Sequence, residues 1–305
     1  MNILEIQHLS KRFGSTQAID DLSFSVPEGS IFGFIGQNGA GKTTTMKLIL
    51  GLLKADQGTV LIEGEKVSFG ETKTNRKIGY LPDVPEFYNY LKASEYLSLC
   101  GEITGLSKEL IKARSEELLK LVGLSKVNKK IGAYSRGMKQ RLGIAQALLN
   151  EPKLLICDEP TSALDPLGRK EILDILSQVK GKTTVIFSTH ILSDVERICD
   201  HVAVIRHGKL IMADSLDNIK ANHASESISL EFKNVKDKET FMACVEIKDK
   251  FILKELGQTG LLLQTNEIEK TEALVLKIFL DQALPPLRFE INEPSIESLF
   301  LEALQ

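Results

Sequence analysis

The stretch GQNGAGKT, Gly36 to Thr43, constrains this chain more than any other because it fits the pattern GxxxxGK[ST] in full. An apolar run precedes it and a helical run follows, which is the context that a phosphate-binding loop requires. Glycines let backbone N–H groups turn toward phosphate oxygens, and the helix N-terminus adds the positive end of its dipole. We therefore predict that a nucleotide binds at Gly36, Gln37, Asn38, Gly39, Ala40, Gly41, Lys42, Thr43 and Thr44.

Within this loop, Lys42 can reach the β- and γ-phosphates, and the Thr43 hydroxyl can bind Mg²⁺. Two later apolar runs end in polar residues: LLICDEP ends in Asp158 and Glu159, and FSTH ends in His190. Ligands bind outside the carboxyl ends of the strands in open α/β sheets, so these side chains should meet the phosphate loop. We expect Asp158 to bind Mg²⁺, Glu159 to act as general base and His190 to contact the γ-phosphate.

The stretch YSRGMKQR places a serine where a helix should begin, just before the run LGIAQALL. Ser135 supplies a hydroxyl at that helix start, and Gly137 lets the backbone approach a phosphate. The chain already has a complete phosphate loop, so a second helix end of this kind is best explained by the nucleotide of a partner. The stretch therefore predicts a dimer.

The strand and helix patterns predict an α/β domain over residues 1–215. Residues 1–30 alternate like antiparallel strands, and residues 85–135 have a mostly helical period. Beyond them, apolar strands alternate with helices, which predicts a mostly parallel sheet covered on both faces. The helical part is expected over about 84–150, and HVAVIRHGKL, 201–210, is expected to be one strand.

The order of the expected elements and the charge both change in the tail, residues 216–305. Its order β-α-β-β-α-β predicts a small ferredoxin-like α+β layer, with one added helix over SIESLFLEAL, 295–304. The tail holds 10 Lys and Arg against 16 Asp and Glu, and the rest of the chain holds 28 against 25. Neither part shows the basic stripe of a phosphate-backbone binder, so no nucleic-acid partner is expected.

Composition indicates a cytosolic protein. No apolar run approaches the roughly 18 residues that would span a bilayer, and the N-terminus lacks the long apolar stretch of a signal peptide. The four cysteines are scattered with no CxxC pair, which favours free thiols over a disulfide framework or a zinc site. A cytosolic location is compatible with docking of this protein onto a membrane protein.

Taken together, the motifs GQNGAGKTT, IGYLPD, YSRGMKQR, LLICDEP, TSALDP and FSTH resemble, in order and spacing, the ATP-binding subunit of an ABC (ATP-binding cassette) transporter. The resemblance implies a P-loop ABC ATPase domain with an antiparallel N-terminal β piece and a helical subdomain. It implies hydrolysis of ATP by a dimer with a second copy or a homologous subunit. It also implies a separate transmembrane permease that holds the protein at the inner face of the membrane.

The same resemblance implies a role for individual residues. Phe13 is similar to the aromatic on which adenine stacks, and Ser162 to Asp165 are similar to the D-loop that crosses between partners. The signature, usually LSGGQ, is here Tyr134 to Met138, which differs at three positions but keeps Ser135 and Gly137. The signature residues that act on the partner's ATP are then Ser135, Arg136, Gly137 and Met138.

A second departure from the family lies after IGYLP, where the Q-loop glutamine is replaced by Asp83. Asp83 either contacts the Mg²⁺ shell or is a solvent-facing residue of a Pro-bounded turn. The aromatic segment that follows has two interpretations as well: it is a socket for a helix of the membrane subunit, or it is the core of the helical subdomain. Its residues are Phe87, Tyr88, Tyr90 and Leu91.

The tail resembles the C-terminal extension of ATPase subunits in drug- and antibiotic-exporting systems, which favours export. Its role is either regulatory and dimer-stabilising or that of a passive folding cap.

Two other functional classes compete with the transporter. A soluble ABC-type ATPase acting on nucleic acid or ribosomes usually has two cassettes or a long coiled coil, and this chain has neither. A small-molecule kinase would not need the signature stretch or FSTH.

Overall fold

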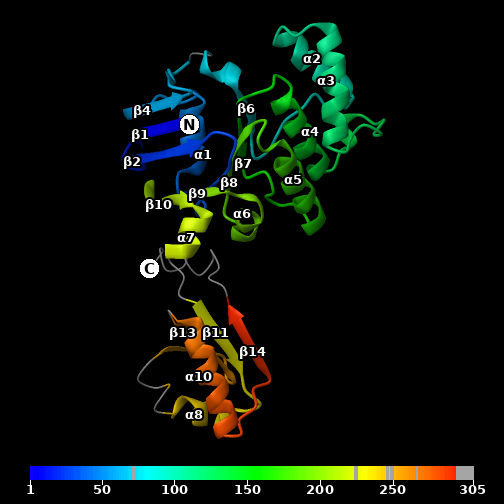
Figure 1. Ribbon diagram of the computed structural model, residues 1–305. Helices are drawn as coiled ribbons and strands as arrows, with labels where there is room; N and C mark the ends of the chain where they lie inside the picture. The colour runs from blue at the N-terminus through cyan, green and yellow to red at the C-terminus, as the bar shows by residue number, and fades with distance from the viewer. Residues whose placement is uncertain (71–72, 223–225, 245–246, 248–250, 266, 293–305) are drawn as a thin grey trace. The chain divides into compact units, whose positions relative to one another are not determined.

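The computed structural model of the protein describes all residues except 71–72, 223–225, 245–246, 248–250, 266 and 293–305. The chain divides into two compact units, Met1–Leu216 and Asp217–Gln305. Figure 1 draws both units and labels many of their elements. The change of character predicted near Ser215 lies beside this division.

The first unit opens with an antiparallel sheet of four strands in the order β2-β1-β4-β5. Its first two strands bury Ile3, Leu4, Ile6 and Leu9 of β1 and Ile19, Leu22 and Val26 of β2, and irregularities in their pairing interrupt the strict alternation of a half-buried strand. The bounds are β1 (Asn2–Phe13), β2 (Thr16–Pro27), β4 (Gln57–Ile62) and β5 (Glu65–Lys66).

The second sheet has six strands in the order β10-β9-β3-β8-β7-β6. All neighbours pair in parallel except β10, which is antiparallel to β9. Strands β3, β7 and β8 are buried along their whole length, as expected for a sheet covered on both faces. The predicted mostly parallel sheet is confirmed. The bounds are β3 (Ile31–Ile35), β6 (Ile78–Leu81), β7 (Leu154–Asp158), β8 (Thr184–Thr189), β9 (His201–Arg206) and β10 (Lys209–Ser215).

Helices α2, α3 and α4 pack against one another to one side of this sheet (Figure 1). The helical period predicted over 85–135 is wrong at its start, since residues 84–92 form no helix. Pro85 pushes Val84 out of the helical region, and the next helix begins only after Lys92, whose N–H donates to the Glu95 side chain at 2.8 Å as part of the cap. The bounds are α1 (Lys42–Ile49), α2 (Ala93–Ile103), α3 (Lys108–Leu121), α4 (Arg136–Leu148), α5 (Pro166–Val179), α6 (Leu192–Ile198) and α7 (Leu216–Asn222), with 3₁₀ turns at Thr74–Lys77 and Ile131–Ala133.

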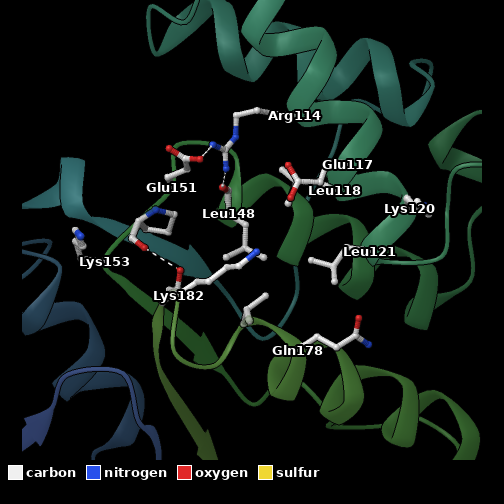
Figure 2. A pocket seen from close by; sticks show the side chains of 13 residues that line it. Arg114, Glu117, Leu118, Lys120, Leu121, Leu148, Glu151, Lys153, Gln178 and Lys182 are labelled. Atoms are coloured by element: carbon white, nitrogen blue, oxygen red, sulfur yellow. Dashed lines mark hydrogen bonds and ion pairs between the residues drawn. The ribbon is translucent and has the colours of Figure 1, made fainter.

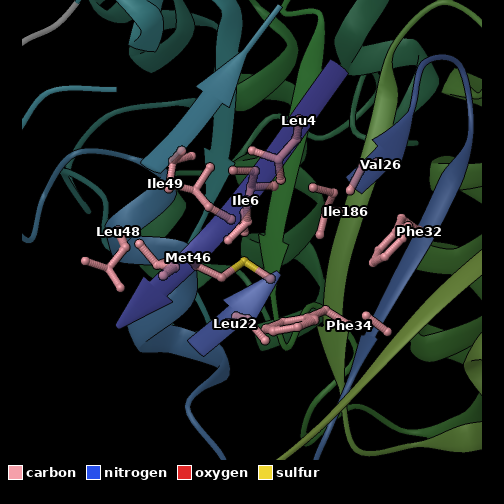
Figure 3. Close-up of a cluster of buried hydrophobic side chains, with 14 of the residues drawn as sticks. Leu4, Ile6, Leu22, Val26, Phe32, Phe34, Met46, Leu48, Ile49 and Ile186 are labelled. Atoms are coloured by element: carbon pink, nitrogen blue, oxygen red, sulfur yellow. The ribbon is translucent and has the colours of Figure 1, made fainter. Parts of the chain in front are cut away.

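The main core lies between the two sheets and includes helix α1 (Figure 3). Phe24 of β2 stacks on Phe32 and Phe34 of β3, with ring centroids 5.6 and 5.4 Å apart. Burying the apolar face of α1 here fixes the position of its first residue, Lys42. The core residues labelled in Figure 3 are Leu4, Ile6, Leu22, Val26, Phe32, Phe34, Met46, Leu48, Ile49 and Ile186.

Residues 201–210, predicted to be one strand, are two strands joined by a tight turn. Arg206 of β9 pairs with Lys209 of β10, so the turn contains only His207 and Gly208. Both have positive φ, +49° and +79°. Two central residues of this kind form the turn whose twist matches a two-residue hairpin. The prediction missed it because histidine is uncommon at such a position.

The second unit contains a four-stranded antiparallel sheet in the order β12-β13-β11-β14. Phe232, Phe241 and Phe279 pack together in its core, with centroids 5.2 to 6.1 Å apart. The bounds are β11 (Glu226–Glu231), α8 (Val235–Met242), β12 (Ile252–Leu256), β13 (Gly260–Thr265), α10 (Ile268–Asp281) and β14 (Arg288–Asn292).

These elements of the second unit follow one another in the predicted order, and the ferredoxin-like assignment remains a prediction. The helix predicted over 295–304 lies outside the described residues. The helices that the structure describes are all too short or too polar to cross a membrane. No disulfide joins the four cysteines, each of which falls within the described part of the chain.

Candidate active site

The phosphate loop joins the end of β3 to the start of α1, as predicted. Gly41 occupies the N-cap of α1 with φ +112°. A Cβ atom there would lie 2.7 Å from Ile19 Cδ1 and 2.8 Å from the carbonyl oxygen of Ala18, so only glycine fits. The loop is also tied to the β9–β10 turn, because Gly208 N donates to the Ala40 oxygen at 2.9 Å.

The start of α1 is suited to an anion. No side chain caps it, and its first turn carries no acidic residue. Its backbone N–H groups and the positive end of its dipole therefore remain available to a phosphate. Thr43 and Thr44 lie in this first turn and line the adjoining pocket.

Three of the predicted catalytic residues meet at one carboxylate. Lys42 is 6% exposed, and its Nζ lies 3.0 Å from Glu159 Oε1, an ion pair without hydrogen-bond alignment. Lys42 Nζ also donates to the Gly36 carbonyl oxygen at 2.6 Å. On the other side, His190 Nδ1 lies 2.9 Å from Glu159 Oε2. The geometry thus places Glu159 between the phosphate-binding lysine and the histidine.

The backbone of Glu159 is held in an uncommon conformation, with φ +49°. A non-glycine residue in the left-handed region costs on the order of 1–3 kcal/mol and persists only where the surroundings enforce it. Here the enforcing partner is Ser188, whose Oγ accepts from Glu159 N at 3.0 Å. The same hydroxyl donates to Asp158 Oδ1 at 2.6 Å.

Ser188 is a functional residue that the sequence reasoning missed. It links the two adjacent carboxylates, Asp158 and Glu159, to the next strand of the sheet. Asp158 ends β7 and is 2% exposed, and Ser188 is fully buried directly opposite it on β8. Ser188 is the serine of the FSTH motif, so the sequence motif contained it. Its partner Asp158 is recognised only from the pairing of β7 with β8.

A pocket of about 590 Å³ lies over the phosphate loop. It brings together predicted residues of the loop and of three other segments: Gln37, Asn38, Gly39, Gly41, Lys42, Thr43, Thr44, Asp83, Glu159, Ser162 and His190. It also includes residues that the sequence did not single out: Thr16, Gln17, Ala18 and His207. Asp158, which is 2% exposed, is not among the lining residues.

Phe13, predicted to stack on adenine, lies at the end of β1 and is 48% exposed. It does not line the pocket, but its pairing partner on β2, Thr16, does. Lys11 Nζ lies 5.4 Å from the centroid of the Phe13 ring, so one face of the ring already has a cation. Stacking of adenine on Phe13 stays a prediction.

Asp83 lines the pocket and is about half exposed. Burial raises the pKa of its carboxyl, Arg136 opposes this, and the nearby Asp158 and Glu159 raise it further. Arg136 Nη2 lies 3.4 Å from Asp83 Oδ1, and the buried Gln140 donates to the Asp83 carbonyl oxygen at 2.6 Å. Contact of Asp83 with a metal stays a prediction.

The signature stretch forms the start of α4. Ser135 is the N-cap, and its Oγ accepts from Met138 N at 3.2 Å. Gly137 is open, since the nearest atom to a Cβ there would be Leu164 Cδ2 at 3.8 Å. None of the signature residues 135–138 lines the pocket of its own chain, although the structure describes all four.

The predicted D-loop has one residue in the pocket and one at a helix start. Ser162 lines the pocket, and its N–H donates to the Glu159 carbonyl oxygen at 3.1 Å. Asp165 caps α5 by accepting from Gly168 N at 3.1 Å. Immediately before Ser162, Thr161 Oγ1 donates to the buried Asp194 of α6 at 2.7 Å, which ties this loop to the segment after His190.

A phosphate loop on a parallel sheet, with paired carboxylates and a histidine at the same sheet edge, defines a P-loop nucleotide hydrolase. The protein-family model described as "ABC transporter" matches residues 19–162. The chain is 38% identical to the uncharacterized ABC transporter ATP-binding protein YxlF of Bacillus subtilis, over 99% of both chains. It therefore belongs to the ABC transporter ATP-binding proteins, which hydrolyse ATP.

Two further similarities bear on function. The chain is 36% identical to the bacitracin transport ATP-binding protein BcrA of Bacillus licheniformis, covering 99% of this chain and 97% of that one. A solved dimeric structure of the ATP-binding cassette MJ0796, in a post-hydrolysis state with ADP and Pi, is 27% identical with a TM-score of 0.63. That similarity covers 70% of this chain and 98% of the other.

Proposed function

We propose that this ATP-hydrolysing transporter subunit drives export through a separate membrane-spanning partner, as a dimer that encloses ATP. Similarity to the bacitracin transport ATP-binding protein BcrA supports the transport role, and the observation that carries the hydrolysis driving it is the position of Glu159 between Lys42 and His190 in the phosphate-loop pocket. That arrangement supplies a cation for the γ-phosphate and a base for water at one place.

Hydrolysis follows from these contacts. The γ-phosphate competes with Glu159 for Lys42, so its arrival releases the carboxylate to accept a proton from the attacking water. His190, on the other carboxylate oxygen, keeps Glu159 oriented as that proton arrives. Water oxygen bonds to the γ-phosphorus, the bond to the β-phosphate oxygen breaks, and Lys42 neutralises charge on the products ADP and phosphate.

Mg²⁺ is proposed to enter with ATP. The oxygens that could hold it are the Thr43 hydroxyl, the Asp158 carboxylate and, as an expectation, Asp83. Hydroxyl and carboxylate oxygens are the donors that Mg²⁺ prefers, with phosphates and water completing its shell. The buried Asp158 has one oxygen engaged by Ser188, which suits a carboxylate held in one orientation for a metal. When bound, the ion neutralises phosphate charge.

The dimer is supported by the position of the signature. Ser135 and Gly137 present an open helix start that takes no part in the pocket of their own chain, so a partner's nucleotide is their proposed ligand. The solved MJ0796 cassette, to which this chain is similar, is dimeric. Glu159→Gln should bind ATP without hydrolysing it and accumulate as a dimer by light scattering. A Glu159→Gln chain that stays monomeric in saturating ATP would exclude the ATP-enclosing dimer.

The permease is proposed to dock on the aromatic segment after Asp83. Tyr88 and Tyr90 are 53% and 66% exposed, so they are not core residues, whereas Phe87 is half-buried edge-on against Tyr96 with centroids 5.0 Å apart. The exposure of Tyr88 and Tyr90 therefore supports the interpretation as a socket for the membrane subunit, and the packing of Phe87 supports the interpretation as part of the core. Large exposed aromatic residues beside one another are typical of an interaction surface.

Replacing Tyr88 and Tyr90 with serine should abolish co-purification with the membrane partner while leaving basal ATP hydrolysis unchanged. Phe87→Ser is the matched control, because it should lower the free energy of unfolding instead. Detergent-dependent fractionation of cells tests the proposed peripheral location. Recovery of the doubly substituted chain with its permease, at wild-type yield, would place the docking surface elsewhere.

A further inference from the structure

A second pocket, of about 710 Å³, shares no lining residue with the phosphate-loop pocket. Figure 2 shows it from close by. Pro152 and Lys153 lead into β7 and line it, and so does Thr183, which leads into β8. The nucleotide pocket lies at the other, carboxyl ends of these same parallel strands. The remaining walls come from α3, the end of α4 and the end of α5.

The floor of this pocket is apolar. Leu118 of α3, Leu148 of α4 and Val179 of α5 form it, and each is less than 10% exposed as a residue because its other side packs into the protein. A volume of 710 Å³ lies within the roughly 300–1,000 Å³ of small-molecule sites, and such sites combine an apolar lining with a few polar groups. The pocket therefore suits a ligand with an apolar body.

The rim of the pocket carries an excess of positive charge. Arg114 and Glu151 neutralise each other as an ion pair, and Arg114 also donates to the Leu148 carbonyl oxygen at 3.3 Å. The remaining charged side chains on the rim are one glutamate, Glu117, and three lysines: Lys120, Lys153 and Lys182. Among the described residues, no carboxylate lies within ion-pair distance of any of these lysines.

Lys182 is the lysine best placed to meet a ligand. Figure 2 shows its side chain reaching across the pocket toward Leu148, whereas Lys153 points away. Lys182 is exposed to solvent, and its ammonium group has no carboxylate partner among the described residues, so it is available to the anionic end of a ligand whose apolar body lies on the floor.

We propose that this pocket binds a small amphipathic anion. Its apolar body would lie on the floor of Leu118, Leu148 and Val179, and its carboxylate or sulfonate would meet Lys182. Such a ligand would touch α3 and α5 at once, and so bridge the helical part of the unit to the strands that carry the catalytic carboxylates.

The test uses the full-length chain and the fluorescent aromatic sulfonate 8-anilinonaphthalene-1-sulfonate. Its titration should show one site, from which octanoate displaces it. Acetate, which has no apolar body, and octylammonium, which has the opposite charge, should fail to displace it. Displacement by octylammonium at the same concentration as octanoate would overturn the proposal.

Variants locate the site. The double variant Lys120→Glu, Lys182→Glu should weaken probe binding at least tenfold. The control Lys112→Glu, Lys170→Glu makes the same charge change at exposed positions outside the pocket and should alter binding less than twofold. Both should keep ATP hydrolysis, which shows that they fold. Should the first variant not fold, Lys182→Gln removes the central charge alone; equal binding by Lys182→Gln and wild type would refute the site.

Discussion

Replacing Ser188 with alanine tests how the catalytic carboxylates are held. The Ser188 hydroxyl is fully buried, donates to Asp158 at 2.6 Å and accepts from Glu159 N at 3.0 Å. Ser188→Ala removes both bonds without changing the shape of the strand. It leaves one buried carboxylate with fewer donors and one backbone N–H without its acceptor.

The expected cost follows from these two bonds. A hydrogen bond to a charged group contributes about 1.5–3 kcal/mol, and a buried donor left unpaired costs a similar amount. We expect the free energy of unfolding, measured in urea, to fall by about 2–4 kcal/mol. If half of that loss appears in the transition state, kcat for ATP falls roughly five- to thirtyfold. Nucleotide binding should change less, because Lys42 and the phosphate loop are intact.

Ser115→Ala is the matched control. Ser115 of α3 is 6% exposed, and its Oγ has no hydrogen-bond partner among the described residues. Removing a buried hydroxyl without a partner should be neutral or stabilising, and alanine favours the helix slightly. The changes in the free energy of unfolding that the two Ser→Ala substitutions cause should therefore differ in sign or by more than about 2 kcal/mol. Equal unfolding free energies and equal turnover for both variants would refute this account of Ser188.

Three further predictions concern charge and capping. Burial raises the pKa of Asp194 despite its bond to Thr161. As pH rises from about 3.9, the unfolded chain loses a proton that the folded chain keeps, so stability falls until the raised pKa is passed. Asp194→Asn should remove this fall in the free energy of unfolding, measured by urea titrations from pH 4 upward. An unchanged pH dependence would mean that a group other than Asp194 causes it. Ser135→Asp should keep the cap on α4, so its Tm should stay near that of wild type. It should nevertheless abolish ATP-driven dimerisation, because the new carboxylate repels the partner's phosphate. ATP-dependent dimers of this variant would contradict the proposal that Ser135 binds the partner's nucleotide. Asp83→Ala should lower MgATP turnover and raise the Mg²⁺ concentration required, and unchanged metal dependence would show that Asp83 takes no part.

Much of the active site could be predicted from sequence because its motifs carry their own backbone context. The phosphate loop lies between a strand and a helix, and Glu159 and His190 end strands whose carboxyl ends meet at one edge of a parallel sheet. The meeting of Lys42 and His190 at the Glu159 carboxylate follows from that topology. Ser188 could not be recognised in this way, because its partner depends on which residue of the neighbouring strand lies opposite.

Other parts required tertiary information. His207 reaches the pocket only because the β9–β10 turn is bonded to the phosphate loop through Gly208. The start of the first helix in the mostly helical segment, at Ala93, also required the structure, because residues 84–92 form no helix. The division of the aromatic residues into exposed Tyr88 and Tyr90 and half-buried Phe87 depends on Tyr96, which lies on the next helix.

The pairing of Asp158 with Ser188 across β7 and β8 has a consequence for insertions and deletions. Successive residues of a strand face opposite sides, so one residue added within β8 would turn Ser188 away from Asp158. The turn that joins α5 to β8, unlike the loop after β7 that carries Glu159 and Ser162, has no such constraint. Gly181 is exposed with open space around it, so a residue inserted there should leave turnover nearly intact. This active site is therefore intolerant of length changes inside its strands and tolerant of them in the turn that precedes β8.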